Sequence, residues 1–82
     1  MKTINYITTG TCSRRIDIVV NDDNSVESVI FHGGCNGNTQ GISMLVKGMQ
    51  VNEVIERLEG ITCGNKSTSC PDQLAAALKQ LS

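Results

Sequence analysis

This chain of 82 residues contains four cysteines, an unusual number for its size. They are Cys12, Cys35, Cys63 and Cys70. The chain has one Tyr, one Phe and no Trp, so it lacks most of the large rings that fill the core of a small domain. A core of this size seldom contributes more than about 3–5 kcal/mol, and small domains commonly add disulfides or a bound metal. The cysteines are the residues that can form either kind of cross-link.

The length predicts a single domain over residues 1–82. Residues 1–6 show neither the apolar segment nor the cleavage site of a secretory signal, and no stretch approaches the roughly 20 apolar residues of a membrane span. We therefore expect a cytoplasmic protein, where cysteines more often bind metal or take part in chemistry than form disulfides. The formal net charge of -1, the absence of a basic run and the scarcity of aromatic residues argue against a nucleic-acid partner.

The first part of the chain predicts three strands. Residues 2–8, 15–21 and 26–32 are rich in Ile, Val, Thr and aromatic residues and show partial alternation of apolar and polar positions. Residues 21–25 predict a tight antiparallel hairpin, because Asn, Asp and Ser tolerate turn geometry. Cys12 lies between the first two strands, and we expect it at the tip of a hairpin.

The second part of the chain predicts three helices, because apolar residues recur there at helical spacing. The three apolar stripes are Ile42, Leu45, Val46 and Met49, then Val51, Val54, Ile55 and Leu58, and finally Leu74, Ala77, Leu78 and Leu81. Met44 is expected in or near the core of the first helix. Ser69 or Cys70 is expected to cap the third helix, and Pro71 suits its first turn.

Three strands followed by three helices predict an α+β fold. We expect a three-stranded antiparallel sheet, followed by about three helices packed on one face. In this arrangement all four cysteines fall outside the regular elements. Cys35 and Cys70 lie at or just before helix N-termini, where the dipole and free amides favour the thiolate form that binds metal.

The cysteine pattern alone leaves several kinds of site open. No CxxC pair occurs, so the spacing is not that of a zinc ribbon or zinc finger. A four-thiolate zinc site, an iron-sulfur cluster and a redox dithiol all agree with the residues. His32 is either a nitrogen ligand or acid/base, or a polar residue that ends a strand. Residues 33–41 enter a helix and form a candidate anion-binding turn, although they match no nucleotide-binding motif. Arg14 and Arg15 either neutralise a thiolate-rich site or form a solvated surface pair.

Residues 68–74, TSCPDQL, resemble the TSCPD domain family, which takes its name from this string. The similarity extends to residues 33–38, 41–42, 47–49 and 60–64, and so covers nearly the whole chain. Members that resemble this chain are small stand-alone proteins. Related domains lie at the C-terminus of some ribonucleotide reductases, notably cobalamin-dependent ones, so the resemblance implies a link to DNA biosynthesis.

The chain is also distantly similar to the IscU/NifU-type iron-sulfur scaffolds, and this similarity implies an IscU-like topology. Cys12, Cys35 and Cys70 occupy the places of the three scaffold cysteines. The scaffolds carry an acidic residue where this chain has Arg14, and commonly a His where it has Ser69. The fourth cysteine, Cys63, is extra, which suggests a more permanent site than a cluster that must be transferred.

Three hypotheses follow. In the first, the chain is a non-catalytic module whose four cysteines bind zinc or an iron-sulfur cluster, accessory to ribonucleotide reductase or to nucleotide-linked metabolism. In the second, it is an iron-sulfur scaffold or carrier, with iron-sulfur assembly proteins as partners. In the third, it is a thiol redox carrier that uses Cys63 and Cys70. The isolated domain is not expected to be an enzyme, and any activity belongs to a ribonucleotide reductase system.

Overall fold

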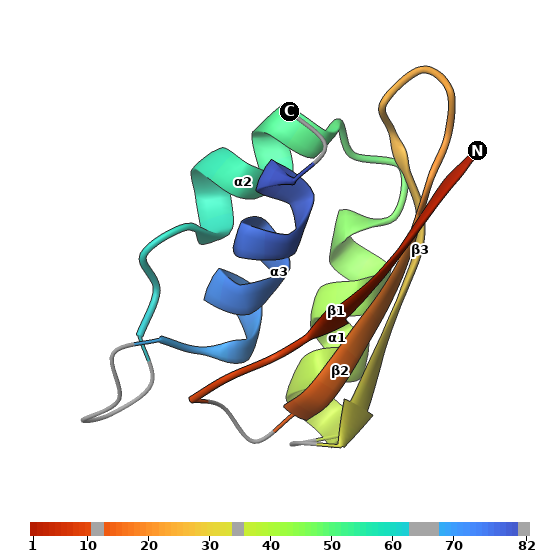
Figure 1. Ribbon diagram of the computed structural model, residues 1–82. Coiled ribbons are helices and arrows are strands. Elements are labelled where there is room, and N and C mark those ends of the chain that lie inside the picture. The colour runs from red at the N-terminus through yellow and green to blue at the C-terminus, as the bar shows by residue number, and fades with distance from the viewer. Residues whose placement is uncertain (11–12, 34–35, 63–67, 81–82) are drawn as a thin grey trace.

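The computed structural model describes residues 1–10, 13–33, 36–62 and 68–80. Within these ranges the chain forms three strands and then three helices, which confirms the predicted α+β class (Figure 1). The elements are β1 (Lys2–Ile7), β2 (Ser13–Val20), β3 (Val26–Gly33), α1 (Asn36–Val46), α2 (Val51–Leu58) and α3 (Cys70–Lys79). None of the helices in this part of the chain is long and apolar enough to span a membrane.

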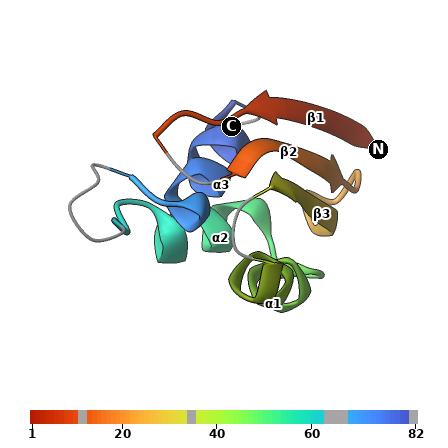
Figure 2. The same cartoon turned by 90° about the horizontal axis from the view of Figure 1, so that it is seen from below.

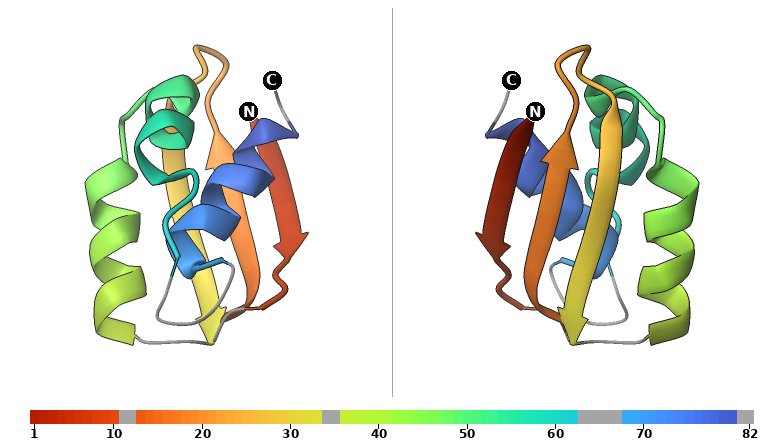
Figure 3. Two further views of the ribbon diagram at one scale, coloured as in Figure 1. Left: turned by 90° about the vertical axis from the view of Figure 1, so that its left-hand side faces the viewer. Right: turned by 90° about the vertical axis from the view of Figure 1, so that its right-hand side faces the viewer.

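The strands form one antiparallel sheet in the order β1-β2-β3. Ile18 in the central strand lies opposite Ile4 of β1 and Val29 of β3. Residues opposite one another share a face of the sheet, and Ile16, Ile18 and Val20 are fully buried on this one. The helices lie on that side, and the other face of the sheet is open (Figure 3). The alternation of side chains therefore sets which face of the sheet carries the core.

The second and third helices supply most of the remaining core. Leu74, Ala77 and Leu78 of α3 are fully buried, as the predicted stripe requires, while Leu81 lies outside the described residues. Val51 and Val54 of α2 are also buried. Helix α3 thus packs as the central member of the helical layer, between the sheet and α2.

The expectation for the first helix is wrong in part. Val46 is buried and Ile42 is half-buried, but Leu45 is 77% exposed and Met44 is 68% exposed. Figure 2 shows why, because α1 lies beside β3 at the edge of the sheet instead of across its inner face. The helix ends at Val46, so Met49 reaches the edge of the core from the segment that follows. An edge position leaves much of an amphipathic helix uncovered.

The predicted turn between β2 and β3 is confirmed. The amide of Asn24 donates to the carbonyl of Asn21 at 2.9 Å, and Asn24 adopts a positive φ of 65°. The carboxylate of Asp23 accepts a hydrogen bond from the amide of Ser25 at 3.1 Å. Asn, Asp and Ser fit this turn because their side chains tolerate left-handed backbone or bond to nearby amides.

Gly10 and Thr68 hold the β1–β2 connection against the residues that precede α3. Gly10 has a φ of +72°, and a Cβ added there would lie 3.1 Å from Cγ2 of Thr68. Glycine adopts this backbone conformation without strain and leaves room for the threonine methyl group. Two connections far apart in the sequence are therefore in close contact.

We predict that Gly10→Ala destabilises the fold more than Gly48→Ala. Gly48 has a similar φ of +87° but open space around it, so its substitution measures the backbone penalty alone, about 1–2 kcal/mol. At Gly10 the new methyl group would also press against Cγ2 of Thr68, so the loss of stability should be larger than the backbone penalty. Urea denaturation of both variants measures the two losses in the free energy of unfolding, and equal losses would show that the contact with Thr68 costs nothing.

Candidate metal centre

The start of α3 is built by a side-chain cap. Ser69 has an extended backbone, and its Oγ accepts a hydrogen bond from the amide of Asp72 at 3.2 Å. Pro71 lies in the first turn, where a missing amide hydrogen leaves no helical bond unmade. The structure confirms Ser69 as the cap and makes Cys70 the first residue of the helix.

The same residues attach α3 to the end of α2. The hydroxyl of Ser69 donates to the carbonyl of Ile61 at 2.6 Å, and the amide of Gly60 donates to Oδ1 of Asp72 at 2.8 Å. Thr68 donates from its hydroxyl to the other carboxylate oxygen of Asp72. These bonds clamp together the two described ends of the loop between α2 and α3.

The hydrogen bonds to Asp72 favour its ionised form. The hydroxyl of Thr68 and then the amide of Gly60 lower the pKa of this carboxyl below its ordinary value, and the charge of Lys79 acts in the same direction. Partial burial opposes the shift but does not cancel it. A carboxylate near a helix N-terminus also meets the positive end of the helix dipole.

Gln73 extends the network to the sheet. Its buried side chain donates from Nε2 to Oγ1 of Thr68 at 3.0 Å, and its Oε1 accepts from the amide of Thr9 at 3.2 Å. Thr9 belongs to the connection between β1 and β2. These hydrogen bonds therefore tie α3 to both the α2–α3 loop and the first hairpin.

Cys70 faces the start of β2. Its Sγ lies 2.8 Å from Oγ of Ser13, a hydrogen bond in which either atom can be the donor. Ser13 is only 4% exposed, and its carbonyl accepts a hydrogen bond from the hydroxyl of Thr8. Ser13 also lies opposite Gly33, the last residue of β3. The sulfur of Cys70 is thus positioned where the ends of two strands meet.

Of the four predicted ligands, only Cys70 lies within the described residues, and Cys12, Cys35 and Cys63 lie outside them. The described part of the chain contains no group of three or more metal-ligating side chains. The described neighbours of the other three cysteines can still be placed. Ser13 follows Cys12, Gly33 is two residues before Cys35, and Ile61 is two residues before Cys63. Ser13 contacts Cys70 and pairs with Gly33, and Ser69 binds Ile61, so these neighbours lie close to the start of α3. The start of α3, the start of β2 and the end of β3 all lie toward the lower end of the molecule in Figure 1.

His32 belongs to a separate cluster, which the sequence reasoning missed. Its Nε2 lies 2.7 Å from Oδ2 of Asp17, and because a carboxylate only accepts, Nε2 carries the hydrogen. Arg15 forms an ion pair with the same carboxylate, Nε to Oδ1 at 3.1 Å. The bond from His32 is the largest cause that lowers the pKa of Asp17, against the opposing effect of desolvation. The spacing of Arg15 and Asp17 on one strand face hinted at this ion pair, but the place of His32 requires the strand register.

We predict that Asp72→Asn lowers the free energy of unfolding at pH 7 by about 2 kcal/mol, because it removes charge-assisted hydrogen bonds. The folded pKa of Asp72 is lowered, so its contribution is complete above the unfolded value of about 3.9 and is lost as the pH falls through the folded value. The gap between wild type and variant should therefore shrink at low pH. Urea denaturation at several pH values measures it, with Glu56→Gln on the exposed side of α2 as the control. A gap that is the same at all pH values would contradict a role for the charge.

The family model of the TSCPD domain matches residues 1–82, the whole chain. The matched residues include the segment 68–72, whose side chains cap α3 and bind the preceding loop. No curated protein and no solved structure matches the chain at a significant level.

Proposed function

The chain belongs to the TSCPD domain family, and we propose that it is a small metal-binding module. Cys12, Cys35, Cys63 and Cys70 bind one zinc ion or one iron-sulfur cluster in this proposal. The module serves a ribonucleotide reductase or another enzyme of nucleotide metabolism, a partner suggested by the family resemblance. The observation that supports the metal site is that Cys70 and described residues within two positions of the other three cysteines lie close together at one end of the fold.

The surroundings of Cys70 suit a metal-bound thiolate. As the first residue of α3, Cys70 lies at the positive end of the helix dipole, which favours negative charge. The hydroxyl of Ser13, 2.8 Å away, can donate to the sulfur when the sulfur is a thiolate. Hydrogen bonds of this kind orient metal ligands and tune their affinity. A bound metal supplies a cross-link between loops and, with it, folding free energy.

The contacts of Ser69 favour a permanently bound metal over a cluster that is assembled and transferred. The scaffolds commonly have a His at this position, where it can act as a labile ligand. Here the Ser69 hydroxyl donates to Ile61 and accepts from Asp72, so its oxygen is engaged in holding the loop and capping the helix. Arg14, at the position of the scaffold's acidic residue, is exposed and cannot replace a carboxylate ligand.

We predict about one equivalent of bound zinc, or of an iron-sulfur cluster, in protein purified without oxygen. Elemental analysis and an absorbance spectrum measure the metal, and single Cys→Ser variants at positions 12, 35, 63 and 70 should each lower its content. Thr62→Ala changes an exposed residue beside Cys63 and should retain the metal. Chelation should strongly destabilise the wild type, because apparent zinc binding in small domains reaches about 10–16 kcal/mol.

Other results would point elsewhere. Substoichiometric metal together with four freely titrating thiols would contradict the metal-binding proposal. A cluster that passes to an apo-acceptor would indicate a scaffold. A metal-free chain that reversibly forms a Cys63–Cys70 disulfide would indicate a redox carrier.

We further predict that Ser13→Ala raises the dissociation constant for zinc by about 10–100-fold, because it removes the hydroxyl beside the Cys70 sulfur. Ser13→Thr keeps the hydroxyl and should restore much of the affinity. Competition with a chromophoric chelator measures both constants, and circular dichroism at saturating zinc checks that each variant is folded. Unchanged affinity in folded Ser13→Ala would show that this hydroxyl does not support the site.

A further inference from the structure

Helix α3 carries a buried polar side chain that the hydrophobic core does not require. Gln73 is 8% exposed, and it lies beside Leu74, Ala77 and Leu78, which are fully buried apolar residues. A side-chain amide loses its hydrogen bonds to water when it is buried, so burial is costly unless the protein supplies partners. An apolar side chain of the same length would avoid this cost. The reason for a glutamine here must therefore lie in the bonds that it makes.

Both ends of the Gln73 amide have a partner. Its Oε1 accepts a hydrogen bond from the amide of Thr9 at 3.2 Å, and its Nε2 donates to Oγ1 of Thr68 at 3.0 Å. The hydroxyl of Thr68 gives its own hydrogen to Asp72, so its oxygen acts as an acceptor toward Gln73. The side chain at position 73 must thus accept at one end and donate at the other, as a glutamine amide does.

One of these bonds reaches a short span of the β1–β2 connection. The amide of Thr8 donates to the carbonyl of Arg14 at 3.2 Å, and the hydroxyl of Thr8 donates to the carbonyl of Ser13. These bonds close the base of the connection around residues 9–13, which we call the Cys12 span. Cys12 belongs to this span by sequence and lies outside the described residues. The two ends of the span, Thr9 and Ser13, are both described.

Helix α3 contacts both ends of the Cys12 span. Gln73 binds the amide of Thr9, and Sγ of Cys70 lies 2.8 Å from Oγ of Ser13. Cys70 and Gln73 are three residues apart on the helix, so they share one of its faces. One face of the first turn of α3 therefore holds the two ends of the segment that contains Cys12.

We propose that Gln73 is a positioning residue of the metal site, which holds the Cys12 span in place beside Cys70. This inference rests on the proposed metal-binding function. The two bonds of Gln73 order the β1–β2 connection and the end of the α2–α3 loop in the folded chain before metal binds. Less conformational entropy is then lost on binding, and the affinity for metal is higher. Gln73 itself is not a ligand, so its loss should weaken binding without changing the number of bound metal ions.

The variant Gln73→Met tests the proposal, because methionine has a similar length and forms neither hydrogen bond. Zinc is the probe, since a site of four thiolates binds it whichever metal is native. Competition with a chromophoric chelator on reduced protein should show a dissociation constant raised about tenfold. Circular dichroism and the zinc stoichiometry at saturation check that the variant is folded and retains the site. In zinc-free protein, hydrogen exchange of the Thr9 amide, followed by NMR, should become several-fold faster.

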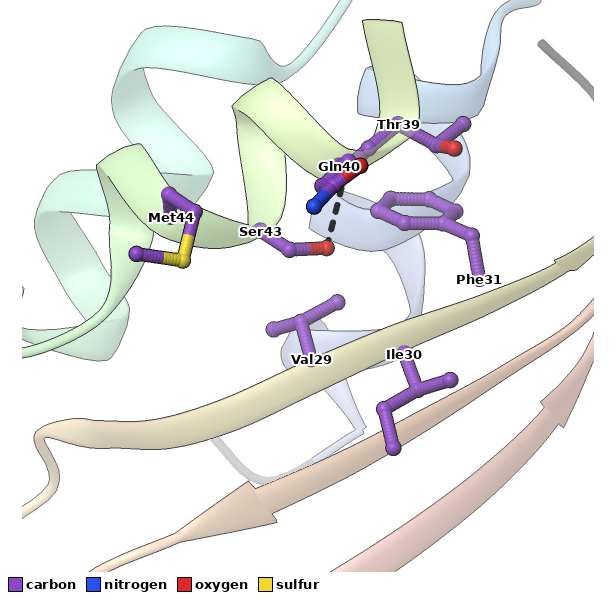
Figure 4. Close-up of a pocket in the computed structure, with 7 residues that line it drawn as sticks. All are labelled: Val29, Ile30, Phe31, Thr39, Gln40, Ser43 and Met44. Carbon is purple, nitrogen blue, oxygen red and sulfur yellow. Dashed lines mark hydrogen bonds between the residues drawn. The ribbon is translucent and has the colours of Figure 1, made fainter. Parts of the chain in front are cut away.

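A matched control separates positioning from a general loss of stability. Val29 is 6% exposed and points from β3 toward α1, at a cavity of about 380 Å³ between the two elements (Figure 4). The residues that line this cavity belong to β3 and α1, away from the Cys12 span and α3. Val29→Ala enlarges the cavity and should lower the melting temperature. It should leave the zinc dissociation constant and the exchange of the Thr9 amide unchanged.

The outcomes distinguish a failure of this inference from a failure of the proposed function. A folded Gln73→Met protein with an unchanged zinc dissociation constant, or with unchanged exchange at Thr9, would overturn the positioning role alone. Equal weakening of zinc binding by Val29→Ala would also overturn it, because the effect would then follow overall stability. A wild type that binds no zinc would overturn the metal-binding proposal and the positioning role together.

Discussion

The hydrogen bonds at the start of α3 hold together the parts of this fold. Helix α3 provides much of the buried surface, and its position is set where Ser69 and Asp72 bind the end of the preceding loop. Gln73 adds the link to the first hairpin. Within the segment that gives the family its name, Thr68, Ser69 and Asp72 are thus engaged in holding the backbone. In the same segment, the side chain of Cys70 contacts Ser13, the residue that follows Cys12.

The order of the elements explains why these connections meet. In an antiparallel sheet, the β1–β2 connection and the end of β3 lie at the same end. Helix α1 then runs back toward the other end and α2 returns, so the segment that follows α2 runs toward the same end of the molecule as the end of β3 (Figure 1). Each cysteine belongs to one of these connections or to the start of α3. A domain with so small a core is one in which a metal cross-link gives a large benefit.

Much of the fold was predictable because its signals are local. The three strands, the second and third helices and the Ser69 cap follow from alternation, helical spacing and capping chemistry. The exposure of Met44 and Leu45 was not predictable, because spacing defines a helix face but not how much of it the sheet covers. The pairing of His32 with Asp17 requires the strand register.

The start of β2 was also not predictable, because the β2–β3 register is irregular there. The register shifts between Ser13 and Arg15, which interrupts the alternation that marks the strand, so the sequence placed its start two residues too late. The contact between Ser13 and Cys70 depends on this extension and could not be foreseen. The four-cysteine site itself stays a prediction, because three of its members lie outside the described residues.

X-ray absorption spectroscopy at the metal edge, on protein purified without oxygen, tests the central claim most directly, because it counts the atoms bound to the metal. We predict a stoichiometric metal whose protein ligands are four sulfurs, at about 2.3 Å if the metal is zinc. A first shell that contains nitrogen or oxygen at about 2.0–2.2 Å would contradict it, as would protein that holds no stoichiometric metal.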